Sequence, residues 1–309
     1  METTMICCLE LSVGRLAETA VTKPIPSSLY DDSVEAPTNG LSLLSIMRKM
    51  YDSETLKPIM PYQPDALLST RMKEALTDAR AEEICKLAAQ WHVNASLSPS
   101  ELDTRVEEVF WLATLLMAAT GKPGRKPRLD FFLMHIVTSA LFIPSLVRAL
   151  PDPSHRTCLL RVTVPIILLI VLVRGRPRID CALVMSYTAV PRPPRAAATS
   201  KDEPVADTNP WLAIVDDSIH AQDAHIVKTI RTLFYAAQRY GETLPGGVPG
   251  AYDAEGNEAL KGAGALDGTL FIRVAGVVMD TLGWVTHGQK EGNWDRSALG
   301  WDAAWDAPD

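Results

Sequence analysis

The sequence has few cysteines, few aromatic residues and no excess of basic charge. Its 309 residues include 5 cysteines and 6% aromatic residues, and the formal net charge is −7. The cysteines lack the CxxC spacing of a zinc module, so we expect reduced thiols and a cytoplasmic location. The acidic balance argues against a nucleic-acid partner, because such a partner requires a basic face.

Long apolar runs are also scarce. The most apolar one, VTVPIILLIVLV at residues 162–173, lies between Arg161 and Arg174 and contains Pro165. A membrane-spanning helix needs about 20 apolar residues. We therefore expect this run to be a buried core helix, with no membrane partner. Residues 1–20 lack a basic leader, so no signal peptide is expected.

Several familiar catalytic motifs are missing. The glycine-rich stretch from Gly262 to Gly268 is one residue too long for a dinucleotide fingerprint and follows no strand-like run. No GxxxxGK[ST] or GxSxG pattern occurs, and Ser218 and His220 would point apart on a helix. These absences argue against a Rossmann flavoprotein and a Ser-His-Asp hydrolase.

Strand-like alternation of apolar and polar residues is rare, so the expected fold class is mainly α. We predict a poorly ordered segment at 1–40 and a single multi-helix domain at 41–309 with long Pro- and Gly-rich loops. Ser98 and Glu101 form a capping-box pattern. Helices are predicted at 41–50, 66–93, 98–120, 130–144, 162–173, 179–190, 216–240 and 267–284, with a surface loop at 190–209.

Two of the predicted helices carry histidines among apolar residues. His225 and Lys228 lie three residues apart, so their side chains share one face of the helix at 216–240. His135 lies in the equally apolar stretch 130–139. Each side chain is either a hydrogen-bonded core residue or part of a shared site. His287 is a further candidate, and Phe131, Phe132, Met134 and Trp211 either wall an aromatic pocket or belong to the core.

A metal centre is one chemistry that these residue types allow. Imidazole suits iron, copper and zinc, and an oxygen ligand would favour iron. Asp130 and Asp223 are nearby carboxylates, although either could instead cap its helix. A protonated Lys228 cannot bind a cation. A neutral amine could add carbon dioxide and become a carbamate, an anionic oxygen ligand; alternatively, the lysine reaches the solvent from the helix edge.

Four ordered motifs resemble the questin oxidase-like family. They are DFFLMHIVTSALFIP at 130–144, Arg174-Gly-Arg-Pro177, Asp223-Ala-His225-Ile-Val-Lys228 and Gly300-Trp-Asp-Ala-Ala-Trp305. The resemblance covers roughly residues 27–309, and the family includes Baeyer–Villiger-type oxidases of fungal polyketide clusters. It implies an oxidoreductase of secondary metabolism that inserts oxygen into an anthraquinone-type polyketide and opens its ring, with dioxygen as cosubstrate.

The resemblance also implies cofactors and site residues. Family members commonly require NADPH, although the sequence shows no fingerprint for it, and iron(II) would suit the histidines. His135, His225 and Lys228 fall on the matching motifs as metal ligands, with Lys228 also a candidate catalytic base. Family members usually have a histidine-rich N-terminal helical region, whereas the first histidine here is His92. A truncated, non-catalytic helical relative that binds a polyketide or a protein is therefore an alternative.

Overall fold

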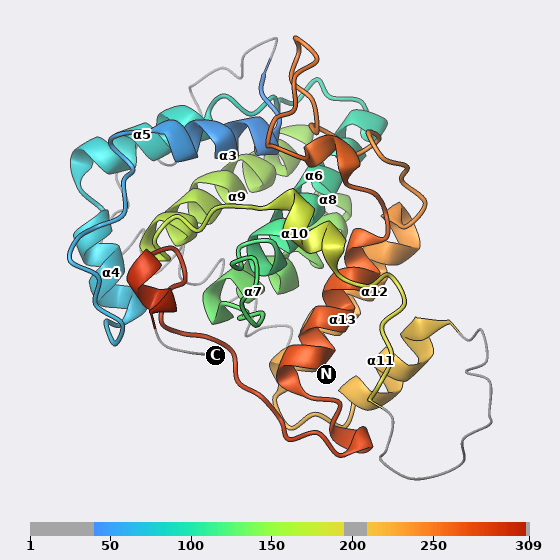
Figure 1. Ribbon diagram of the computed structural model, residues 1–309. Helices are drawn as coiled ribbons and strands as arrows, with labels where there is room; N and C mark the ends of the chain where they lie inside the picture. Colours follow the sequence, from blue (N-terminus) through green and yellow to red (C-terminus); the bar gives the residue numbers. More distant parts are fainter. Residues whose placement is uncertain (1–39, 195–208, 307–309) are drawn as a thin grey trace.

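The computed structural model describes residues 40–194 and 209–306, and helices dominate its secondary structure (Figure 1). In these ranges, β-pairing is limited to three isolated bridges. The predicted mainly-α fold class is therefore confirmed. The predicted poorly ordered segment at 1–40 lies outside the described residues except for its last position, and so does most of the predicted loop at 190–209.

The described helices surround a core that α6 and α9 share. Figure 1 shows α3 and α5 above these two helices and α12 and α13 beside them, while α7 packs against both α6 and α12. The helices are α3 (Leu43–Asp52), α4 (Leu68–Ala75), α5 (Asp78–Ala88), α6 (Pro99–Ala118), α7 (Phe131–Ala140), α8 (Ile143–Ala149), α9 (Pro153–Val173), α10 (Cys181–Ser186), α11 (Pro210–Ser218), α12 (Ala224–Tyr240) and α13 (Leu270–Leu282). The tail after α13 crosses the molecule and ends near α4.

Helix α6 is the central element because its second half is buried on every side. All residues from Glu108 to Ala118 are buried. A helix surrounded by other helices needs no polar face, which explains its nearly continuous apolar sequence. Its start is the predicted capping box: the Ser98 hydroxyl accepts a hydrogen bond from the Glu101 amide, and the Glu101 carboxylate accepts one from the Ser98 amide at 2.8 Å.

Two predicted helices are each divided in two, so those predictions were wrong. The segment 66–93 breaks after Ala75, where Leu76 leaves helical geometry with a ψ of 73°. The segment 216–240 breaks after Ser218, and Asp223 caps the second helix. Apolar periodicity continued across both breaks because the helices on either side of each break contact one core, so the pattern concealed the turns.

The helix predicted at 162–173 was too short, because it begins at Pro153. This run is the second half of α9, a helix of 21 residues that contains Pro165. Both α9 and the segment Phe131–Ala149 are long and apolar enough to cross a membrane. Burial favours the predicted core role, because 56% of the apolar window of α9 is buried inside the protein. Length and composition alone are weak evidence for a span, since core helices share them.

A buried carboxylate of α6 links this helix to α3 and to the segment that follows α5. Glu108 accepts hydrogen bonds from the Leu43 amide at 2.8 Å and the Trp91 indole at 3.2 Å, and it pairs with Arg105. Its side chain is 2% exposed. Burial raises the pKa of Glu108, although Arg105 and the two hydrogen-bond donors oppose this shift.

We expect Glu108→Gln to lower the free energy of unfolding by about 1–3 kcal/mol, because its amide would place a donor against Arg105. It should also change the pH dependence. The folded protein holds a proton on Glu108 more tightly than the unfolded chain does. Stability therefore falls as pH rises from the unfolded value near 4.5 through the folded value, and the variant should lose this decrease. Denaturant unfolding between pH 4 and 8 measures both effects, with exposed Glu82→Gln as the control.

Candidate functional site

Two capped helices bring the predicted histidines together. Asp130 caps α7 by accepting hydrogen bonds from the amides of Phe132 and Leu133 at 2.9 and 3.2 Å. Asp223 caps α12 by accepting one from the His225 amide at 2.9 Å. Both aspartates thus have the capping role that was one alternative for them. Since α7 and α12 pack side by side, residues near their first turns can meet.

His135, His225 and Phe131 form one cluster of rings. The ring centres of the two histidines lie 5.1 Å apart. The Phe131 ring lies 4.6 Å from that of His135 and 5.0 Å from that of His225, in edge-to-face geometry. The structure therefore brings two of the sequence-predicted site residues into contact across two helices.

The hydrogen bonds of the two imidazoles define which nitrogen is available. His135 Nδ1 lies 2.7 Å from the Phe131 carbonyl oxygen, and His225 Nδ1 lies 2.6 Å from an Asp223 carboxylate oxygen. Both partners are acceptors, so each Nδ1 must carry the proton and donate it. In the neutral form, each Nε2 then has a free lone pair. Metal-bound histidines commonly hold their second nitrogen in this way.

Two cationic side chains adjoin this cluster. Lys228 is half-buried, one helical turn beyond His225, and its charge acts on His135. The Arg296 guanidinium carbon lies 3.6 Å from the centre of the Phe131 ring, a cation–π contact. Neither cation forms an ion pair with a carboxylate in the described ranges.

This environment shifts two pKa values. The pKa of His135 is lowered, chiefly by burial and further by the charges of His225, Lys228 and Arg296, against the opposing bond to the Phe131 carbonyl. For Asp223, partial burial raises the pKa, but the hydrogen bonds from the amide and ring of His225 outweigh it and the net shift is downward. His135 is therefore neutral and Asp223 ionised at neutral pH.

The C-terminal tail contributes residues that sequence reasoning missed. Asp295 pairs with the start of α7: its amide donates to the Leu129 carbonyl and its carbonyl accepts from the Phe131 amide, both at 2.8 Å. This pairing places the next residue, Arg296, over Phe131. The Gly300–Trp305 motif drew attention to the tail through its family resemblance, but no periodicity in the sequence links Arg296 to a helix more than 150 residues away.

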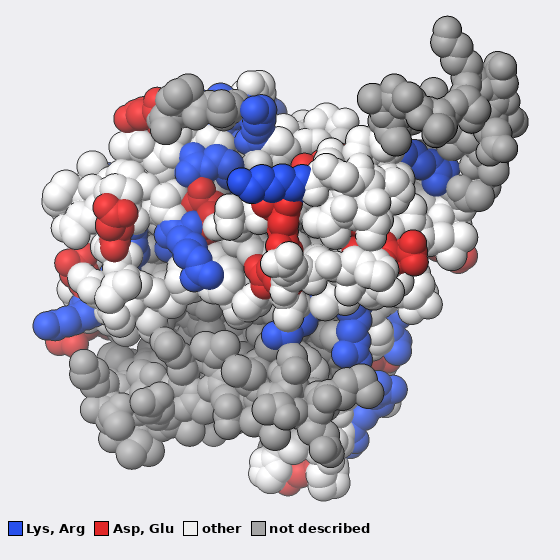
Figure 2. Space-filling model, turned by 90° about the horizontal axis from the view of Figure 1, so that it is seen from below, with Lys and Arg blue, Asp and Glu red and all other residues white. Residues whose placement is uncertain are grey.

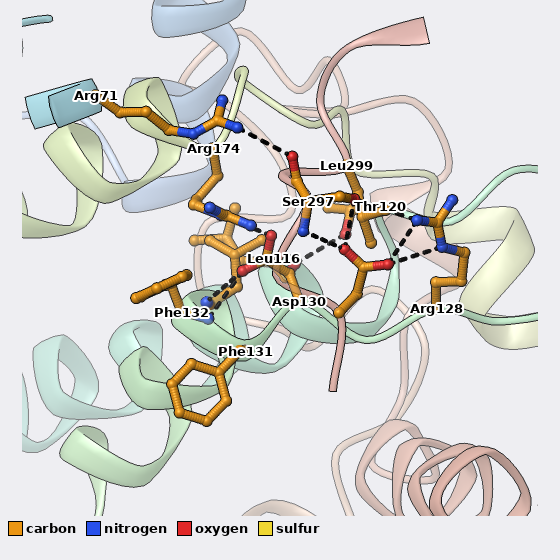
Figure 3. Close-up of polar contacts among 12 residues, drawn as sticks. Arg71, Leu116, Thr120, Arg128, Asp130, Phe131, Phe132, Arg174, Ser297 and Leu299 are labelled. Carbon is orange, nitrogen blue, oxygen red and sulfur yellow. Dashed lines mark hydrogen bonds and ion pairs between the residues drawn. The ribbon is translucent and has the colours of Figure 1, made fainter. Parts of the chain in front are cut away.

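A buried ion pair anchors α7 from the other side (Figure 3). The Arg174 Nε donates to Asp130 Oδ2 at 2.8 Å, and neither side chain has any exposed surface. The Arg174 guanidinium lies 4.6 Å from the Phe132 ring centre. Figure 3 also shows Arg71 reaching the Ser297 carbonyl of the tail, at 3.3 Å. The end of α9, the start of α7 and the tail are thus fixed together.

The other candidate residues lie elsewhere. His287 faces Asp217 at 3.3 Å and the ring of Trp284, not the histidine pair. Ser218 donates to the Val215 carbonyl, and His220 is exposed. Met134 is fully buried core, whereas Trp211 packs against Phe234 in the junction of α11 and α12.

Backbone amides of the glycine-rich stretch already donate hydrogen bonds to a carboxylate of the protein. The Glu258 carboxylate accepts hydrogen bonds from the amides of Gly262 and Gly264 at 2.7 and 2.9 Å. A nucleotide phosphate would need such amides free. The positive φ of 81° at Gly262 is therefore explained by this turn around Glu258.

The two imidazoles are close enough to serve as ligands of one metal ion. Their ring centres lie 5.1 Å apart, and the bond from a metal to a histidine nitrogen is about 2.1 Å long. Within the described ranges, no three His, Cys, Asp or Glu side chains lie close enough to hold an ion together. Lys228 is the remaining predicted ligand in that part of the chain.

Comparison with known proteins identifies the family to which this helical chain belongs. The family model described as questin oxidase-like matches residues 10–233, and the chain belongs to this family. The match includes α7, α9 and the motif from Asp223 to Lys228, and it ends before the tail that carries Arg296. It begins earlier than the predicted resemblance, which started near residue 27.

Individual relatives are similar at low identity. The chain is 23% identical to "Questin oxidase" of Aspergillus fumigatus over 268 residues, which is 82% of this chain and 51% of that protein. It is 24% identical to "Baeyer-Villiger monooxygenase AacuH" of Aspergillus aculeatus, over 77% of this chain and 46% of that protein. It is 25% identical to "Baeyer-Villiger oxidase mdpL" of Emericella nidulans, over 82% of this chain and 52% of that protein. The chain thus spans about half the length of these curated relatives.

Asp130→Asn is expected to destabilise the protein by about 3–5 kcal/mol, because it leaves Arg174 buried and unpaired. Asp152→Asn is the matched control, since Asp152 caps the exposed start of α9 through the same kind of bond, to the Ser154 amide at 2.8 Å. The control substitution should lower the free energy of unfolding by no more than about 1 kcal/mol. Equal losses in denaturant unfolding would show that the buried charge pair has no special role.

His135 should titrate below the ordinary histidine value of 6.5. Removing one neighbouring charge by Arg296→Gln should raise its pKa, because the protonated imidazole would then be repelled less. Proton–nitrogen NMR of labelled histidine measures both values, with exposed His155 as the internal reference. An unchanged His135 value in the variant would mean that Arg296 does not act on the ring.

Proposed function

We propose that this protein is a Baeyer–Villiger-type oxygenase that opens the ring of an anthraquinone-type polyketide in fungal secondary metabolism, acting in the cytoplasm. The observation that carries the proposal is the meeting of His135 and His225 from two helices, with both Nδ1 atoms held by acceptors. The family and the printed names of the relatives support the reaction class.

The proposed reaction uses one dioxygen and one NADPH for each substrate. One oxygen atom enters the bond between a quinone carbonyl carbon and its neighbouring ring carbon. The other oxygen atom leaves as water, with two electrons from NADPH and a proton from solvent completing the balance. The inserted oxygen forms an ester within the ring, and hydrolysis of that ester opens it.

His135 and His225 would hold an iron(II) ion through their Nε2 atoms, and the ion would supply dioxygen activation. The Asp223 carboxylate and the Phe131 carbonyl keep the two rings in the tautomer that leaves Nε2 free. Lys228 has two proposed roles. It is either the third ligand as a carbamate or a base whose Nζ receives a proton from a substrate hydroxyl.

A second candidate function is binding without turnover. The chain spans about half the length of its curated relatives, and no group of three His, Cys, Asp or Glu side chains in the described ranges could hold a metal ion. A relative that has kept the aromatic cluster but lacks a complete metal centre would still bind a polyketide or a protein partner.

Incubation of the purified protein with a hydroxyanthraquinone, iron(II), NADPH and ¹⁸O-labelled dioxygen tests the proposal. We expect a product that has gained one labelled oxygen. His135→Gln and His225→Gln should each lower the rate at least about a hundredfold, because each removes a metal ligand. His287→Gln, outside the cluster, is the matched control and should retain the rate.

Metal and mass analysis of the same preparation separates the two candidate functions. Iron bound in the parent protein and lost in both cluster variants supports the oxygenase, and a mass gain of carbon dioxide on Lys228 supports the carbamate role. Labelled product absent under every cofactor combination, together with retained hydroxyanthraquinone binding, would refute the oxygenase and favour the binding protein.

A further inference from the structure

The charge of the histidine cluster indicates what kind of ligand it accepts. Its two basic side chains come from separate parts of the chain, Lys228 from α12 and Arg296 from the tail. Neither has a carboxylate partner within the described ranges. The charges of both act on His135. Like charges that adjoin without a counter-ion favour an anionic ligand.

The acidic groups beside the cluster are already engaged. One Asp223 carboxylate oxygen accepts from both the amide and Nδ1 of His225. The Glu291 carboxylate accepts from the Asp223 amide at 3.0 Å. Each therefore serves to fix the start of α12 and forms no ion pair with either cation.

The cluster also contains several flat groups. The Phe131 ring meets Phe132 edge to face, with ring centres 5.4 Å apart, and it contacts both histidine rings. Arg296 is exposed and lies on the face of Phe131. A guanidinium plane held in this way can stack against a second aromatic ring and donate hydrogen bonds from its edge. Lys228, by contrast, offers a compact point charge.

We propose that Arg296 and Lys228 form the recognition element for an aromatic anion, a flat ring system carrying a phenolate or a carboxylate. Arg296 stacks on the ring system, and Lys228 pairs with the anionic oxygen beside the two histidines. This inference rests on the proposed function, whose substrate it specifies as the ionised rather than the neutral form, and it makes Lys228 the ammonium partner of that anion in place of the carbamate or the base named above. Arg296 and Lys228 thereby determine specificity from outside the histidine pair.

Binding of two matched probes tests this inference without any turnover. Anthraquinone-2-carboxylate carries a permanent charge, and anthraquinone-2-carboxamide has nearly the same shape without it. We expect the carboxylate to bind at least about tenfold more tightly in low salt, and this advantage to shrink at high ionic strength. Quenching of tryptophan fluorescence, without NADPH and under nitrogen, measures both affinities.

Variants identify the residues responsible. Lys228→Gln should weaken carboxylate binding about tenfold and leave carboxamide binding within about twofold, whereas Arg296→Gln, which also removes the stacking plane, should weaken the binding of both probes and that of the carboxylate more, by about tenfold. Arg296→Lys, which retains the charge but loses the plane, should bind the carboxylate with an affinity between those of the parent protein and Arg296→Gln. Arg239→Gln is the matched control, because Arg239 lies over the Tyr235 ring of the same helix at 4.6 Å, as Arg296 lies over Phe131. Far-ultraviolet circular dichroism confirms that each variant is folded.

Equal affinities for the two probes, or carboxylate affinity unchanged in a folded Arg296→Gln variant, would overturn the inference. These outcomes are independent of the oxygenase test. Charge-dependent binding without any labelled product would refute the oxygenase and leave the recognition element in place. Labelled product, together with equal affinities for the charged and uncharged probes, would support the oxygenase and refute the recognition element.

Discussion

The buried ion pair between Asp130 and Arg174 is the constraint on which the candidate site depends. Two fully buried charges are expensive to desolvate, so the pair persists only because the surrounding groups fix its geometry. Asp130 satisfies two amides at the start of α7 and the Nε of Arg174, while Phe132 covers the guanidinium face. The first turn of α7 is thereby held, and with it Phe131 and His135.

The tail completes this arrangement from the opposite direction. Arg128 binds Asp295 through two nitrogens at 2.9 and 2.6 Å, and Asp295 pairs with the backbone on both sides of Asp130. Beyond it, Trp301 packs so closely on Gly175 that a Cβ there would lie 2.2 Å from its ring. A glycine is required at that position both for this contact and for its φ of 82°. The tail is therefore part of the folded core, and Arg296 has a fixed place over Phe131.

Local sequence signals predicted much of the fold. The capping box at Ser98, the apolar faces and the prolines at helix ends were enough to locate most helices, because these features act within a few residues. They failed at 76–77 and 219–223, where a single core contacts the helices on both sides and periodicity continues. They also failed for α9, whose polar first half, from Pro153, hid its full length.

The sequence by itself determined the helical class, the caps of α7 and α12 and the residue types of the candidate site, because each depends on neighbours along the chain. Only the tertiary structure decided which of those residues meet. The packing of α7 against α12 brought His135 to His225 and left His287 with Asp217. The return of the tail added Arg296, since a contact across such a separation depends on the path of the whole chain rather than on any local pattern.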